Sequence, residues 1–136
     1  MKKIFILVFS VILVLGCINV RLNEDSGKDE KAVTGPVLRH VVLFKFSDST
    51  TVGKVKDIEE AFRKLPEKID VIEDFEWGTD ISTEGLAQGF THCFLVTFAD
   101  EKGRDAYIPH PAHQEFVALA KPYFEKVLVL DYLSRD

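Results

Sequence analysis

The chain has 136 residues, of which 17 are Lys or Arg and 22 are Asp or Glu, and its formal net charge at pH 7 is −5. A surface that binds nucleic acid needs a clustered excess of Lys and Arg, because each phosphate contact neutralises a negative charge. The acidic balance therefore argues against nucleic acid as a partner. It also argues against a polybasic patch that would attract anionic lipids.

The N-terminus contains the parts of a secretory signal. Two lysines precede an apolar run over residues 4–15, which is shorter than the roughly 20 residues of a membrane-spanning helix. The Gly16-Cys17 pair that follows resembles the bacterial lipoprotein signal, in which the cysteine thiol is lipidated and the cysteine starts the mature chain. An uncleaved anchor helix is the alternative. We expect a signal peptide over residues 1–16 and a lipid-anchored Cys17, on the bacterial cell envelope and facing outside the cytoplasm.

The rest of the chain divides into a tether and one domain. Without Lys2 and Lys3 the 17 basic residues become 15 against 22 acidic ones, a balance of −7, so membrane attachment would depend on the acyl chains alone. Residues 17–36 are polar and lack a periodic apolar pattern, which predicts a disordered tether. Residues 37–136 are enough for one small domain. Cys93 has no disulfide partner if Cys17 carries lipid, and we expect it to be a small buried hydrophobe.

Apolar periodicity in the domain predicts an α+β fold. The expected strands are 38–46, 71–82, 90–98 and 124–133, and the expected helices are 52–65, 101–108 and 112–121. The polar segment 48–51 can cap the first helix, and Pro66 ends it. This order predicts a ferredoxin-like βαββαβ protomer, with helices on one face of an antiparallel sheet. The strands are apolar on both faces, so we expect a homodimer whose two sheets face each other.

The segment Tyr107-Ile108-Pro109-His110-Pro111-Ala112-His113 is the most informative in the chain. Each proline fixes a φ angle and removes a backbone donor. Pro111 suits the first turn of a helix, with His110 near the cap position. The segment therefore holds two imidazoles and a phenol in a defined arrangement. It could equally be a stiff loop without chemistry.

A cavity between sheet and helices would be mostly apolar with a few polar groups, as small-molecule sites usually are. The expected ligand-binding residues are His40, Val42, Phe44, Phe62, His92, Phe94, Val96, His110 and Phe116. The alternative is a plain core with hydrogen-bonded histidines. His40 and His92 would lie toward opposite ends of paired strands, about 20 Å apart, and no acidic residue is evidently placed to complete a metal triad with them. We therefore expect no metal and no cofactor.

Tyr107 and His113 are the candidate catalytic residues. Histidine titrates near neutral pH and can take up and return a proton. A protonated phenol can donate to a developing oxyanion. Such a pair suits proton abstraction beside a carbonyl, followed by aldol-type ring closure.

The chain resembles the stress-responsive A/B barrel domain family, the dimeric α/β barrels. The resemblance rests on segments 39–46 and 77–78, on Thr91-His92, on Tyr107 with the His110–His113 element, and on Asp131-Tyr132. It implies a ferredoxin-like protomer and a dimer. One plant branch is a polyketide cyclase that works without a cofactor, and its tyrosine and histidine fall on Tyr107 and His113.

Three hypotheses follow. The protein is a dimeric module on the envelope that holds a small apolar or aromatic compound. Alternatively, it is a cofactor-free acid–base enzyme of the cyclase or lyase type that uses His113 and Tyr107. The third is a structural dimer, or a larger assembly, without a ligand. The ligand, the reaction and the choice between inner and outer membrane stay open at this point.

Overall fold

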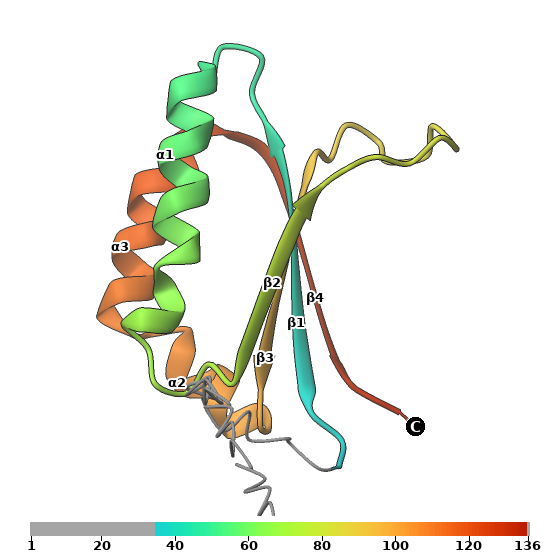
Figure 1. Ribbon diagram of the computed structural model, residues 1–136. Coiled ribbons are helices and arrows are strands. Elements are labelled where there is room, and N and C mark those ends of the chain that lie inside the picture. Colours follow the sequence, from blue (N-terminus) through green and yellow to red (C-terminus); the bar gives the residue numbers. More distant parts are fainter. Residues whose placement is uncertain (1–34, 136) are drawn as a thin grey trace, which may run out of the picture. The chain divides into compact units, whose positions relative to one another are not determined.

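A computed structural model describes residues 35–135 (Figure 1). The expected signal peptide, Cys17 and nearly all of the tether lie outside these residues, so those expectations stay predictions. Within the described range, no helix combines the length and apolarity needed to cross a membrane.

The domain is an antiparallel sheet covered on one face by helices (Figure 1). Its elements are β1 (Leu38–Phe46), α1 (Val52–Arg63), β2 (Asp74–Thr79), β3 (His92–Phe98), α2 (Glu101–Tyr107), α3 (Pro111–Ala120) and β4 (Phe124–Leu133), with short 3-10 turns at Leu65–Glu67 and Lys121–Tyr123. The four strands lie in the order β2-β3-β1-β4. The predicted ferredoxin-like α+β protomer is therefore confirmed.

Local chemistry sets where these elements begin and end. The Thr51 hydroxyl caps α1 by accepting from the Lys54 amide at 3.3 Å, as the polar segment before the helix predicts. The Asp100 carboxylate caps α2 by accepting from the Gly103 amide at 3.0 Å. α1 ends earlier than predicted, at Arg63, because Pro66 cannot donate to an α-helical bond and the chain tightens into a 3-10 turn.

Strands β2 and β3 are shorter than the pattern predicts, because turns occupy their expected ends. The Ile72 amide bonds back to the Ile69 carbonyl at 3.2 Å, so β2 starts at Asp74. The Ser82 amide bonds to the Asp80 side chain at 2.9 Å, which turns the chain after Thr79. The Phe90 amide likewise closes a turn onto the Ala87 carbonyl before β3.

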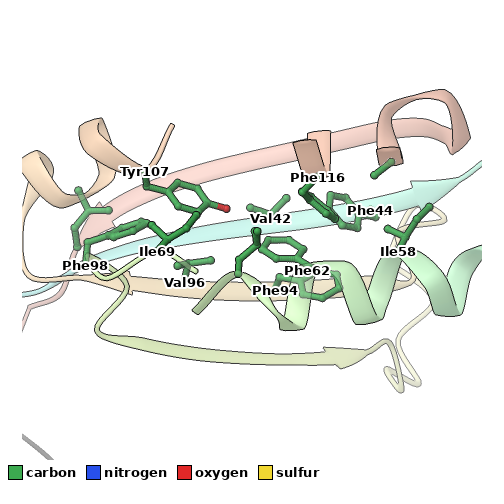
Figure 2. Packing of buried hydrophobic residues seen from close by; sticks show 13 residues of the cluster. Val42, Phe44, Ile58, Phe62, Ile69, Phe94, Val96, Phe98, Tyr107 and Phe116 are labelled. Carbon is green, nitrogen blue, oxygen red and sulfur yellow. The ribbon is translucent and has the colours of Figure 1, made fainter. Parts of the chain in front are cut away.

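The core lies between the sheet and the helices and is rich in phenylalanine (Figure 2). The Phe62 ring from α1 stacks on Phe94 of β3, with ring centroids 4.3 Å apart. It also meets Phe116 of α3 at 4.6 Å, while Phe44 of β1 meets Phe94 at 5.2 Å. These interlocked rings fix α1 and α3 on the sheet.

The opposite face of the sheet is apolar at its centre, and no helix of the described part of the chain covers it. It carries Val41, Leu43, Cys93, Leu95, Leu128, Leu130 and Tyr132; we call these residues the free sheet face. The three from β4 are between 41% and 55% exposed. The expectation that Cys93 is buried is wrong for the protomer, because its position in β3 points away from the helices and leaves the thiol exposed.

Candidate functional site

A cavity of about 380 Å³ lies on the helix side of the sheet. Every layer of the domain contributes to its wall. It is lined by His40, Val42, Phe44, Phe62, Tyr107, His113, Phe116, Val117, Lys121, Phe124, Val127 and Val129. Eight of these twelve side chains are Val or Phe, so the cavity has the apolar lining of a small-molecule site.

Tyr107 provides a buried polar group in this wall. Its side chain is 1% exposed, and its hydroxyl has no hydrogen-bond partner among the described residues. Figure 2 shows the hydroxyl directed inward, toward Val42, rather than toward the surface. Burial raises the pKa of Tyr107 well above its usual 10, so the phenol stays protonated and can act as a donor.

The turn between α2 and α3 places His113 beside Tyr107. The His110 side chain caps α3 by accepting from the Ala112 amide at 3.2 Å, and Pro111 occupies the first helical turn. Both features were predicted from the sequence. One helical turn further along, the ring of His113 lies against that of Tyr107, with centroids 4.2 Å apart.

The hydrogen bonding of His113 defines which ring nitrogen can act as a base. Its Nδ1 lies 2.8 Å from the Ile108 carbonyl oxygen. A carbonyl only accepts, so Nδ1 carries the proton and Nε2 keeps its lone pair. Burial lowers the pKa of His113, although the bond to Ile108 opposes this in part. The imidazole is therefore neutral near pH 7.

His40 also lies beside Tyr107, with ring centroids 5.7 Å apart. Its Nδ1 donates to Oδ1 of Asp131 at 2.6 Å, and Arg104 donates to Oδ2 at 3.3 Å. The register of β1 and β4 places Asp131 directly opposite His40, a pairing that the sequence analysis did not identify. The available signal was an acidic residue, Asp131, directly after the apolar run 127–130 of this strand.

His92 does not reach the cavity. Its Nε2 lies 2.9 Å from Oε1 of Glu59 in α1, and its Nδ1 lies 2.7 Å from the Thr91 hydroxyl. An acidic residue therefore accompanies this histidine too. His92 pairs with Phe44, four positions from His40. The two histidines lie toward opposite ends as expected, although their separation along the strands is about 13 Å rather than 20 Å.

Of the remaining residues that we expected to bind a ligand, some line the cavity and others do not. Val42, Phe44, Phe62 and Phe116 line the cavity, whereas Phe94 and Val96 are closed in the core and His110 is occupied as a helix cap. Sequence reasoning missed five lining residues: Val117, Lys121, Phe124, Val127 and Val129. Val117 and Lys121 follow His113 at four-residue intervals along one helical face. Within residues 35–135, no group of His, Cys, Asp and Glu side chains is placed to hold a metal ion.

Fold and cavity together define a ferredoxin-like α+β protein with an apolar chamber between its sheet and its helices. The sequence places the chain within this class. Residues 38–134 match the model of the Stress responsive A/B Barrel Domain, and the chain belongs to this family.

Curated relatives in plants span nearly the same domain. The chain is 40% identical over 98 residues to a stress-response A/B barrel domain-containing protein, HS1, of Arabidopsis thaliana, covering 72% of this chain and 89% of the relative. It is 31% identical over 98 residues to olivetolic acid cyclase of Cannabis sativa, covering 72% of this chain and 97% of that enzyme.

Solved structures show the same fold. The hydroxynitrile lyase from Passiflora edulis has 25% identity and a TM-score of 0.70, over 74% of this chain and 94% of the enzyme. A dimeric ferredoxin-like protein of unknown function from Thermobifida fusca has 27% identity and a TM-score of 0.63, over 74% of this chain and 93% of the other.

Proposed function

We propose that this protein is a homodimer that binds a small apolar or aromatic compound in the cavity beside Tyr107. The observation that carries the proposal is the Tyr107 hydroxyl, which is buried in the cavity wall without a partner among the described residues. An unsatisfied buried polar group costs about 1–3 kcal/mol. A ligand with an acceptor such as a carbonyl oxygen would recover part of this cost, while its apolar body would occupy the phenylalanine- and valine-lined chamber.

The free sheet face supports the homodimer. Its apolar side chains extend over three neighbouring strands, and monomeric proteins rarely expose large continuous apolar patches. A second copy of the same face would cover it with two-fold symmetry. The dimeric state reported for the Thermobifida fusca relative agrees with this arrangement.

The second candidate is an enzyme that performs acid–base chemistry without a cofactor. His113 has a free Nε2 lone pair and a lowered pKa, and protonated Tyr107 lies beside it. In this reaction Nε2 takes a proton from the carbon next to a carbonyl group. The Tyr107 hydroxyl donates to the carbonyl oxygen as negative charge develops there. The enolate then attacks a second carbonyl carbon, and the imidazolium gives its proton to the alkoxide oxygen that forms there.

Two relatives whose names state enzymatic activities support this second candidate. One is named olivetolic acid cyclase, and the other is named hydroxynitrile lyase. The two names refer to different compounds. We therefore propose the acid–base pair as the shared element, and leave the identity of the substrate to the experiment.

Ligand-dependent thermal stability tests both candidates. Full-length protein is melted with a panel of small apolar and aromatic acids and ketones, alongside the variants Tyr107→Phe and His113→Ala. A ligand at a hundredfold excess over its Kd stabilises the native state by about 2.7 kcal/mol. We expect a shift in the wild type that both variants reduce, and turnover assays with that compound then decide between binding and catalysis. No shift with any compound would contradict a ligand cavity and favour a purely structural dimer.

We also propose the envelope location, with the lipid on Cys17 and residues 18–36 as a tether. The supporting pattern is the basic start, the short apolar run and the cysteine that follows Gly16. Mass spectrometry of the protein from a bacterial membrane fraction should show an acylated N-terminal cysteine. Cys17→Ala should abolish both the modification and the membrane association. An unmodified, full-length chain in that fraction would favour the uncleaved anchor helix.

A further inference from the structure

The two ends of the cavity differ in chemistry. Tyr107 and His113 lie at one end, as described above. At the other end the ring of Phe124 stacks on Phe44 with centroids 4.2 Å apart, and Lys121 completes the lining. The first end offers neutral hydrogen-bonding groups, whereas the second offers a cation.

The rise per residue along α3 and along β1 gives nearly the same distance between the two ends of the cavity. His113 and Lys121 are eight residues apart along α3 and the turn that continues it, which is about 12 Å at the helical rise. His40 and Phe44 are four residues apart along β1, which is about 13 Å. A ligand that touches both ends must therefore be extended.

Lys121 is the single lysine or arginine among the residues that line the cavity. The lysines that form ion pairs within residues 35–135 are Lys45, Lys54 and Lys64, so the ammonium of Lys121 is available for an anion. Between Lys121 and His113, the same helical face presents Val117. The middle of the cavity consequently favours an apolar chain.

We propose that the natural ligand is an extended apolar carboxylate, with its anionic end at Lys121 and a carbonyl group at the Tyr107 end. The inference rests on the proposed ligand cavity and specifies the class of compound: an oxo or acyl acid with about 12 Å between its two polar groups. Tyr107 supplies the donor for the carbonyl oxygen. Neutral apolar compounds would lack the ion pair, and amines would place a like charge beside Lys121.

Three ligands with the same ten-carbon tail test the role of charge. Decanoate, decanol and decyltrimethylammonium are titrated calorimetrically into full-length protein at low salt. We expect decanoate to bind about fivefold more tightly than decanol, the size of a partly exposed ion pair, and the cation to bind most weakly. Lys121→Gln should abolish this order and Lys121→Arg should keep it. Lys56→Gln is the matched control, because Lys56 is exposed on α1 and outside the cavity.

A second comparison tests the carbonyl. A decanoate with a ketone at its penultimate carbon should bind more tightly than decanoate to the wild type, but not to Tyr107→Phe. Thermal melts confirm that each variant is folded. Equal binding of decanoate and decanol, unchanged by Lys121→Gln, would overturn the carboxylate inference and leave the ligand cavity intact. Failure of all three ligands to bind would also overturn it, while the compound panel would separately decide the proposed function.

Discussion

Replacing Tyr107 by Phe should stabilise the protein in the absence of ligand. The substitution keeps the aromatic ring, whose centroid lies 5.1 Å from that of Phe98 and 4.2 Å from that of His113. It removes only a hydroxyl that is buried without a partner among the described residues. An unpaired buried polar group costs about 1–3 kcal/mol, so the free energy of unfolding should rise by about 1 kcal/mol or more.

The assay is thermal denaturation at a fixed protein concentration, since assembly makes the Tm depend on concentration. A gain of 1 kcal/mol corresponds to a rise of about 4–8 °C for a domain of this size. Tyr123→Phe is the matched control, because Tyr123 is only half-buried and the removal of its hydroxyl should change stability little. A loss of stability of 1 kcal/mol or more in Tyr107→Phe would show that the hydroxyl is paired in the folded protein, and would refute the reasoning.

Three further predictions concern the core, the free sheet face and His113. Phe62→Ala should lower the free energy of unfolding by about 3–5 kcal/mol in urea, because Phe62 is 1% exposed and packs on several rings; a loss under 1 kcal/mol would contradict that packing. Leu130→Asp should convert the dimer to a monomer in sedimentation velocity, whereas Leu119→Asp, on the helix side, should leave it dimeric; an unchanged Leu130→Asp dimer would place the interface elsewhere. The pKa of His113 is lowered by folding, so the unfolded chain binds its proton more readily and stability should fall as the pH drops below about 6.5. His113→Gln should lose less stability than the wild type between pH 7 and 5, and identical pH profiles would contradict the assignment.

The sequence predicts the elements well where apolar and β-branched residues form continuous runs. β1 and β4 occupy the predicted residues because such runs determine strands strongly. The ends of β2 were wrong, since the turns at Ile69–Ile72 and Asp80–Ser82 depend on specific hydrogen bonds within apolar or ambiguous sequence. Local patterns do not contain that information.

The candidate site was predictable only in part. The Tyr107–His113 segment is local, so prolines and helix capping could be read directly from it. Asp131 is ninety-one residues from His40, and only the register of β1 against β4 brings the two together. The exposed position of Cys93 has a related cause. A strand that is apolar on both faces does not reveal which face meets the helices.

β4 has a consequence for how the protein must be produced and handled. Among residues 35–135 it pairs only with β1, spans ten residues and forms one border of the sheet, so no described strand bonds to its outer backbone donors and acceptors. Such a border accepts strands from any extended chain, and it invites indiscriminate aggregation when it is long and apolar. Its charged residues, Glu125, Lys126 and Asp131, flank an uninterrupted apolar centre over residues 127–130. A dimer through the free sheet face would leave this border open, so heating should end in precipitation rather than in reversible unfolding.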